Sequence, residues 1–323
     1  MPFCPISKMR KHSFVALLSL LIIAHPLYAW FDGGHMLVAY IAYKNLTPKT
    51  QARVDTLLKL NPMYVQWTQG VSEDQRGLVA FLNGATWPDC IKQTACSAGY
   101  TSDGGDTPPG KPTDAQNIGY ADKFMHKYWH FVDIPYASGA AGEPAKVPNA
   151  LTQIVALSQA IGTDESEDVK SYDVIWLEHL VGDVHQPLHC TSRFTKNHPN
   201  GDAGGNFLAF CQRPCRDELH AYWDGLLGDK PSIADVSQTG QALLARARPI
   251  EADNADPHAW VNDSFGLAKA LVYVSPISAD NDPSVLISPR PDASYSAKAS
   301  DAARSQATLA GHRLADLLNA NLK

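Results

Sequence analysis

The stretch WLEHLVGDVHQPLH, residues 176–189, sets both the fold class and a candidate site. It continues an apolar helix predicted over 168–184, and Pro187 ends it because proline cannot continue a helix. His179 and Asp183 stand four residues apart, so their side chains share one helix face, with Cβ atoms about 5–6 Å apart. A buried imidazole and a buried carboxylate are costly unless they are paired or bind a metal. We therefore expect a buried helix that presents a metal-binding pair.

The same spacing recurs at His220 and Asp224. Either pair alone could be a histidine that hydrogen-bonds to its aspartate. Two pairs together, with His130 and His189 as further candidates, favour metal binding. Imidazole and carboxylate ligands suit zinc, and carboxylate-bridged ions are common in two-metal hydrolases. Gly182, inside the helix, indicates that another element approaches closely at that point.

Outward from this helix, apolar residues recur at helical spacing along most of the chain. Thr47 and Pro48 are typical of an N-cap followed by proline at the first helical position. Strand-like alternation is nearly absent. We therefore predict an all-α fold, a single-domain helical bundle over residues 30–323, with loops at 97–118, 191–206 and 275–291. The other expected helices cover 34–44, 48–60, 74–82, 149–161, 217–227, 233–247, 257–274 and 293–321.

The first 29 residues are interpreted as a secretory signal peptide. Three cations at positions 8, 10 and 11 precede an apolar run over 14–24 that is short for a membrane span, and Ala29 offers a cleavage position. The alternative is an uncleaved membrane anchor. With no second long apolar run, the mature chain is expected to avoid the membrane, to be secreted or periplasmic, and to be a monomer.

The charge balance excludes one class of nucleic-acid protein. Removing the three cations of the signal peptide from the formal net charge of −6 leaves −9. An acidic chain lacks the broad basic face that duplex DNA binding uses. Any contact with nucleic acid must therefore be concentrated at a site.

Five cysteines remain after residue 29, which suits an oxidising compartment and leaves at least one of them without an intrachain partner. Local bridges Cys90–Cys96 and Cys211–Cys215 are the simplest pairing, with Cys190 free. Sequence alone does not give the connectivity.

Cleavage after Ala29 would give Trp30 a free α-amine, whose ordinary pKa of about 7.7–8 lets a cation displace its proton near neutral pH. The amine and carbonyl of Trp30 could then chelate one ion, with His35 one helical turn away. The alternative is an ordinary buried tryptophan. His130 among aromatic residues and Asp89 after Trp87-Pro88 are weaker candidates, because each has a common structural explanation.

Taken together, these residues resemble the zinc-dependent single-strand nucleases and 3′-nucleotidases of fungi, plants and bacteria, the S1/P1 nuclease family, whose more distant cousin is the zinc phospholipase C. The resemblance covers essentially the whole mature chain. It rests on Trp30 with Gly34-His35, Trp87-Pro88-Asp89, Trp129-His130-Phe131-Val132-Asp133, His179-x3-Asp183-x-His185-Gln-Pro-Leu-His189, Gly204-Gly205-Asn206, His220-x-x-Trp223-Asp224, Trp260-Val-Asn-Asp-Ser264 and Gly311-His-Arg-Leu-Ala315.

The resemblance implies three zinc ions and nine ligand residues. One ion would be held by Asp89, His130, His179 and Asp183. A second would take the amine and carbonyl of Trp30, His35 and the bridging Asp183. The third would be held by His189, His220 and Asp224, whereas His185 is not a ligand and is expected outside the first coordination sphere or at the surface.

The implied activity is hydrolysis of single-stranded DNA and RNA to 5′-mononucleotides, together with 3′-nucleotidase activity. Asp89 would also act in catalysis as a proton acceptor for the attacking water. Phe131 and Asp133 match positions that hold a base by stacking and hydrogen bonding, and Asn206 would contact the phosphate or base. Stacking tolerates many sequences but needs an unpaired base, which accounts for single-strand preference.

Three other interpretations were weighed. A phospholipase C on the same scaffold usually has Glu as its last zinc ligand, whereas this chain has Asp224. A non-catalytic zinc-binding protein would not need Phe131 or the Gly-Gly-Asn206 loop. A helical secreted domain with purely structural histidines does not account for nine matching positions.

Overall fold

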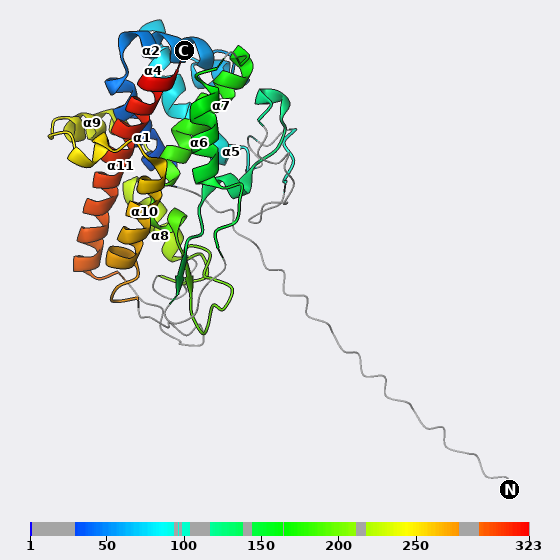
Figure 1. Cartoon of the computed structure of the whole chain (residues 1–323), viewed down its shortest axis with the longest axis vertical. Coiled ribbons are helices and arrows are strands. Elements are labelled where there is room, and N and C mark those ends of the chain that lie inside the picture. The colour runs from blue at the N-terminus through cyan, green and yellow to red at the C-terminus, as the bar shows by residue number, and fades with distance from the viewer. Residues whose placement is uncertain are drawn as a thin grey trace.

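The computed structural model describes residues 1, 30–93, 96, 99–103, 117–137, 144–163, 165–210, 218–277 and 291–322. Helices make up most of this part of the chain, which confirms the predicted all-α class (Figure 1). The expected signal peptide, apart from Met1, lies outside the described residues, as do most of 97–118 and 275–291. No helix among the described residues is both long and apolar enough to cross a membrane.

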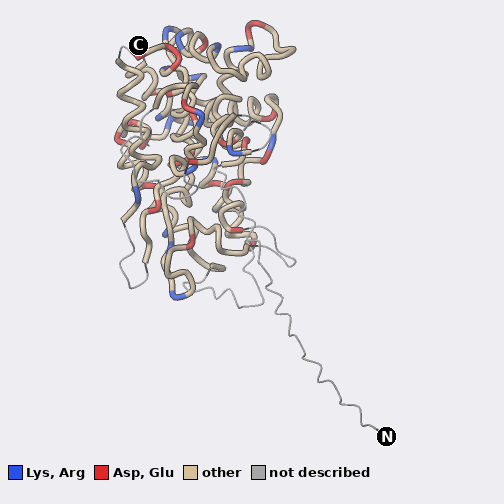
Figure 2. The backbone as a smooth tube through the Cα atoms, turned by 90° about the vertical axis from the view of Figure 1, so that its right-hand side faces the viewer, with Lys and Arg blue, Asp and Glu red and all other residues tan. Residues whose placement is uncertain are grey.

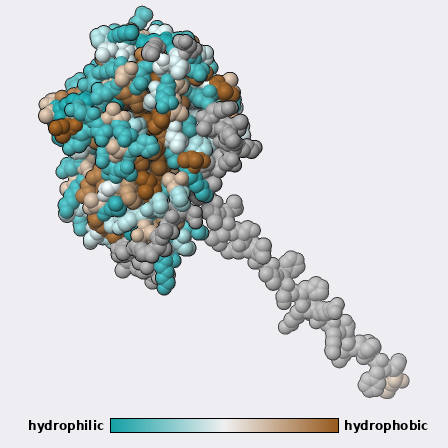
Figure 3. Space-filling view, viewed as in Figure 1, coloured by the Kyte–Doolittle hydropathy of each residue, from teal (hydrophilic) through white to brown (hydrophobic). Residues whose placement is uncertain are grey.

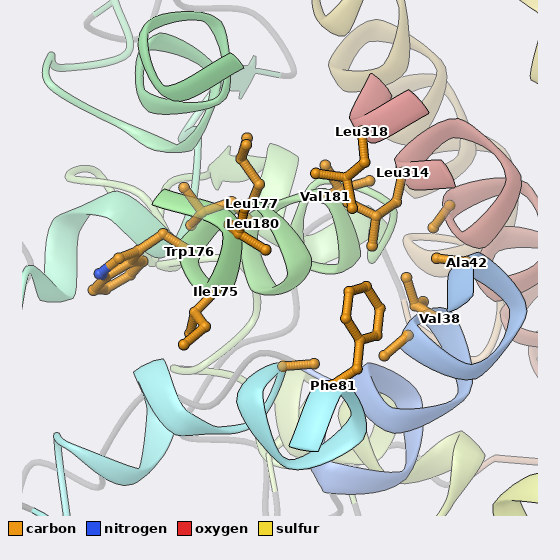
Figure 4. Packing of buried hydrophobic residues seen from close by; sticks show 14 of the residues in the cluster. Val38, Ala42, Phe81, Ile175, Trp176, Leu177, Leu180, Val181, Leu314 and Leu318 are labelled. Carbon is orange, nitrogen blue, oxygen red and sulfur yellow. The ribbon is translucent and has the colours of Figure 1, made fainter. Parts of the chain in front are cut away.

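Three helices form the centre of the bundle: α1 (Asp32–Asn45), α7 (Glu167–Asp183) and α11 (Ala293–Asn321). The first and last helices of the fold pack against each other, and both contact α7. Apolar side chains from these helices and from α4 meet in one core (Figure 4). Its labelled members include Val38, Ala42, Phe81, Ile175, Leu180, Val181, Leu314 and Leu318.

The remaining elements surround this centre. The longer ones are α2 (Pro48–Leu58), α4 (Glu73–Gly84), α6 (Ala150–Ala160), α9 (Ile233–Leu244) and α10 (Pro257–Leu267). The short α-helices are α3 (Tyr64–Trp67), α5 (Trp87–Cys90) and α8 (Leu219–Asp224). The 3₁₀ turns are η2 (Gly119–Ala121), η3 (Lys127–His130), η4 (Pro187–Cys190), η5 (Gly225–Leu227) and η6 (Ile250–Asp253), and η7 (Ala268–Val272) is a π-helical turn.

The predicted helices are confirmed with shifts at their ends, and 293–321 agrees at both ends. Two predictions need correction. The helix expected over 257–274 is α-helical only to Leu267 and continues as the π-helical η7. Within the described part of 217–227, only Leu219–Asp224 is α-helical, and a 3₁₀ turn follows. The short helices α3 and α5 were not predicted, because four residues are too few to show a period.

Side-chain hydrogen bonds cap the N-termini of α2 and α7. The hydroxyl of Thr47 accepts a hydrogen bond from Thr50 N (3.2 Å) with Pro48 at the first position, as predicted. Ser166 caps α7 by accepting from the backbone N–H of Val169. These bonds satisfy N–H groups that the first helical turn leaves without partners.

One short parallel pair of strands joins two segments of the site. The strands β1 (Pro135–Ala137) and β2 (Ser192–Phe194) pair with Tyr136 opposite Arg193. Just before this pair, Val132 N donates to the carbonyl of His189 (2.6 Å). The pairing therefore holds the segment after His130 against the segment that carries His189.

The predicted bridge Cys90–Cys96 is present, and Cys190 is free and buried. Cys211 and Cys215 lie outside the described residues. The buried Cys190 thiol donates a hydrogen bond to the carbonyl of Val184 (3.3 Å), so it is part of the packed core.

Along the backbone of the described residues, the positions of Lys and Arg are interspersed with those of Asp and Glu (Figure 2). Figure 3 shows a mainly hydrophilic face crossed by an apolar band over α6 and α10. A cavity of about 330 Å³ lies in this region, lined by residues of α6, α10 and the end of α11. The mixed charge agrees with the expectation that nucleic acid would be contacted only locally.

The contact between α1 and α11 depends on Gly311. A Cβ atom there would lie 2.6 Å from Ile41 Cβ and 3.0 Å from Val38 O. We expect Gly311→Ala to lower the free energy of unfolding by about 1–3 kcal/mol, because overpacking forces the helices apart. Denaturant unfolding would measure this. Gly266→Ala is the matched control: nothing lies within 4 Å of its Cβ, so stability should stay equal or rise. Equal effects of the two changes would contradict this packing argument.

Candidate metal centre

Four elements bring a compact group of titratable side chains to one face of α7. His179 and Asp183 come from α7, His35 from α1, Asp89 from α5 and His130 from η3. All five are almost completely buried. The i, i+4 pair on α7 has the predicted geometry, with His179 Nε2 3.2 Å from Asp183 Oδ2.

Gly182 allows α1 to approach α7, as the sequence indicated. A Cβ at Gly182 would lie 2.9 Å from His35 Nδ1. The His35 ring stacks on that of His179, with centroids 3.9 Å apart. Its Nε2 lies 3.5 Å from Asp183 Oδ1 and 3.8 Å from Asp89 Oδ2. His130 completes the group, with Nδ1 2.8 Å from His179 Nε2 and 3.2 Å from Asp183 Oδ2.

A second group adjoins the first. His189 lies in η4, and His220 and Asp224 share one face of α8. The Nε2 atoms of His189 and His220 are 3.1 Å apart, and His220 Nε2 is 3.5 Å from Asp224 Oδ2. Asp183 Oδ1 lies 3.9 Å from His189 Nδ1, so the two groups form one cluster.

Backbone carbonyls fix the orientation of three of these rings. His179, His189 and His220 donate from Nδ1 to the carbonyls of Ala85, His130 and Gly204, at 2.7–2.8 Å. In its neutral form, each ring therefore turns its Nε2 lone pair inward. The Nε2 atoms of His189 and His220 thus face each other as two lone pairs, an arrangement that a cation between them would stabilise. Carbonyl partners of this kind commonly orient metal-ligating histidines.

The buried polar atoms of the cluster give a second test of whether these residues could hold a metal ion. Among the described residues, Asp224 Oδ2, both oxygens of Asp183 and both ring nitrogens of His35 are buried without a hydrogen-bond partner. Burial raises the pKa of Asp183 to about 6 and that of Asp224 well above its usual range. Burial, and then His179 nearby, lower the pKa of His35 well below its usual value. A divalent cation would favour both the ionised carboxylates and the neutral imidazoles, so the donor set fits a metal.

Three sets of ligand atoms, each within 4.8 Å of one another, could hold an ion. One is the predicted third site, His189, His220 and Asp224. The other two divide the α7 group differently from the prediction, because His179 belongs to both of them. These sets are His35, His179 and Asp183, and Asp89, His130 and His179.

Trp30 lies beside the cluster. Its side chain is fully buried, and its indole N–H donates to the carbonyl of Gly182 (3.1 Å), the residue before Asp183. The next residue, Phe31, donates its N–H to the carbonyl of Asp224 (3.1 Å). The start of the described fold is thus tied to both ligand-bearing segments.

The sequence analysis did not select Lys92. Its side chain is 3% exposed, and Nζ lies 2.6 Å from Asp89 Oδ1. The signal that could have revealed it is its position three residues after Asp89, which places the two side chains on one side of a helical turn. A buried ammonium group therefore lies beside the cluster, paired with Asp89.

The predicted substrate residues converge on one small cavity of about 30 Å³. Phe131, Asp133 and Asn206 line it together with His130, His189 and His220. The cavity therefore joins both groups of candidate ligands to the residues expected to hold a base.

His185 is not part of the cluster and, against one of the two expectations, is not at the surface. It is fully buried, its Nδ1 donates to the carbonyl of Val181 (2.7 Å), and its Nε2 accepts from Arg313 Nη1 (2.9 Å). The next residue, Gln186, donates to Asp224 Oδ1 (2.7 Å), a contact that the sequence did not predict.

A helical bundle that buries adjoining His/Asp groups beside a small cavity has the donor set of a metal-binding protein. More particularly, the family model for S1/P1 nuclease matches residues 30–323, and the chain belongs to that family. The resemblance drawn from the motifs is confirmed. Enzymes of this family are zinc-dependent, which agrees with the buried donor set.

Individual relatives are nucleases by name. The chain is similar to nuclease S1 of Aspergillus oryzae, with 28% identity over 210 residues, covering 63% of this chain and 56% of the relative. It is 27% identical to endonuclease 5 of Arabidopsis thaliana over 288 residues, covering 80% and 82% of the two chains. Endonuclease 3 of the same plant is 24% identical over 217 residues, covering 66% and 59%. The match thus spans little more than half of nuclease S1 and most of endonuclease 5.

The close approach at Gly182 can be tested by metal affinity. In Gly182→Ala the new methyl group would displace His35, and we expect zinc affinity about 10- to 100-fold weaker, the usual effect of disturbing a ligand's orientation. Competition with a chromophoric chelator would measure it. Gly266→Ala again serves as the control and should bind zinc as the parent does. Unchanged affinity in Gly182→Ala would rule out His35 as an oriented ligand.

Proposed function

We propose that the chain is an extracytoplasmic, zinc-dependent endonuclease that hydrolyses single-stranded DNA and RNA to 5′-mononucleotides and also acts as a 3′-nucleotidase. The observation that carries this proposal is the cavity in which Phe131, Asp133 and Asn206 adjoin three candidate metal ligands. Family membership and the nuclease relatives support the reaction class, phosphodiester hydrolysis.

The cluster would hold three zinc ions, with Trp30 contributing its processed amine and its carbonyl. The side-chain ligands would be His35, Asp89, His130, His179, Asp183, His189, His220 and Asp224. Zinc, when bound, supplies a Lewis acid for the phosphate and a water that ionises near neutral pH. Burial of the ligands supports this assignment, because charge stabilisation is stronger where solvent is excluded.

The side chains of this chain would then perform the remaining tasks. Asp89 would accept the proton of the attacking water. Lys92, held against Asp89 at 2.6 Å, would place its ammonium charge near the phosphate oxygens. That positive charge would stabilise the negative charge that develops during displacement.

Substrate selection would follow from the cavity wall. Phe131 would stack on a base while Asp133 and Asn206 bind polar groups of the nucleotide. A base paired inside a duplex has no free face to stack, so the site would favour single strands. The negative net charge supports the same preference, since duplex binding relies on extended basic contacts.

The first test is zinc content per chain on protein that begins at Trp30, with single-stranded DNA digestion assayed before and after chelation. We expect close to three zinc ions, release of 5′-mononucleotides, loss of activity on chelation and recovery with zinc. Duplex DNA of the same sequence is the control and should be cut far more slowly. Zinc binding with release of phosphocholine from lipid, and no nucleotide release, would instead favour a phospholipase. An absence of zinc would overturn the ligand assignment.

A second test concerns the processed N-terminus. One extra residue before Trp30 removes the free α-amine and crowds the cluster, so we expect loss of about one zinc ion per chain and at least a tenfold lower rate. A chain that begins at Trp30 with a single residue added after Lys323 is the control. Equal zinc content and equal rates in the two proteins would show that the amine is not a ligand.

A further inference from the structure

The loop over 201–207 has a backbone that few residue types can adopt. Three successive residues, Ala203, Gly204 and Gly205, have φ values of 49°, 62° and 84°. The carbonyl of Asp202 accepts hydrogen bonds from the N–H groups of Gly205 (3.1 Å) and Phe207 (3.3 Å). These turns fix the course of the backbone at the next two residues, Asn206 and Phe207.

The loop is fixed to the protein core through the side chain of Asp202. This carboxylate is completely buried, accepts a hydrogen bond from the Tyr273 hydroxyl (2.9 Å) and accepts another from Arg193 N (2.8 Å). Residues presented by the loop are therefore held in place before any ligand binds, which lowers the entropic cost of binding.

The same loop is part of the candidate site. The carbonyl of Gly204 orients His220, and a Cβ at Gly204 would lie 2.4 Å from Leu188 O. Ala203 and Asn206 line the cavity that also contains Phe131. Phe207 follows Asn206 directly, so the loop that forms part of this cavity wall also carries Phe207.

Phe207 is exposed, whereas the larger apolar side chains that follow it are buried. Its relative exposure is 63%, whereas those of Leu208 and Phe210 are 5% and 2%. Its ring lies against the half-buried ring of His198, with centroids 6.3 Å apart and planes 25° from parallel. The outer face of Phe207 is thus a solvent-facing aromatic surface on a rigid loop, and core packing does not explain it.

We propose that Phe207, supported by His198, stacks on the base of a second nucleotide, adjacent to the nucleotide held at Phe131. This inference rests on the proposed function and deepens it: the site would recognise at least two consecutive unpaired nucleotides. Phe207 would be a specificity-determining residue for oligonucleotides. It would make no contact with a mononucleotide, whose single base is held at Phe131.

The test compares two substrates in Phe207→Ala. For a short oligothymidylate we expect KM to rise about 5- to 50-fold, which lies within the range expected for loss of one stacked base, with kcat within twofold. For a 3′-mononucleotide both constants should stay unchanged. Phe207→Trp should retain the KM of the parent for the oligonucleotide, and Phe207→Leu, which keeps apolar volume without a ring, should resemble the alanine variant.

A binding measurement separates recognition from turnover. Fluorescence anisotropy with a phosphorothioate oligothymidylate should show the same 5- to 50-fold weakening in Phe207→Ala. Ile250→Ala is the matched control, because Ile250 is an 80% exposed apolar residue on η6 and lies outside the candidate site. This substitution should leave the kinetic constants for both substrates and the affinity for the probe unchanged.

Two outcomes would overturn the inference in different ways. If the parent protein cleaves both substrates and Phe207→Ala changes neither, or changes both equally, Phe207 is not a base platform and the proposed function stands. If the parent cleaves neither substrate with zinc bound, the proposed function fails and the inference fails with it.

Discussion

The architecture depends on one electrostatic constraint: carboxylates and imidazoles are gathered where no water can solvate them. Asp183 and Asp224 are buried beside imidazole rings that backbone carbonyls orient, and burial lowers the pKa of the His35 ring. Such a group is costly without a cation and favourable with one. The close approach of α1 to α7, the short α5 and the turn of η3 each bring one of these donors to the same place. The bundle can thus be understood as a scaffold whose centre is completed by metal.

Ligand orientation comes from the backbone more than from neighbouring side chains. Carbonyls of Ala85, His130 and Gly204 each receive a ring N–H, so each histidine has one tautomer and one direction. Because these carbonyls belong to the ends of helices and to turns, small changes in those connections would reach the ligands directly. The loop that carries Asn206 and Phe207 is an example, since one of its carbonyls orients His220 while its tip forms the cavity wall.

The sequence pattern was sufficient to predict the long helices and the pairs His179/Asp183 and His220/Asp224. Helical periodicity and i, i+4 spacing are local properties, so they can be read without the fold. Asp89 and His130 could be selected only through the family resemblance, since the elements that present them are four residues long and show no period. Lys92 and Gln186 were missed, because their roles arise from contacts formed after folding. The amino-acid composition of the π-helical turn at Ala268–Val272 does not distinguish it from the helix before it.

The pairing of the first and last helices has a consequence for biosynthesis. α1 carries His35, and it packs against α11, where Gly311 lets the two backbones approach and Asn319 donates to the carbonyl of Asn45 (3.1 Å). Since α11 follows every other described element in the chain, α1 lacks this partner until α11 has been synthesised. Chains terminated before α11 would therefore carry every candidate ligand and still lack the helix that supports α1 around His35.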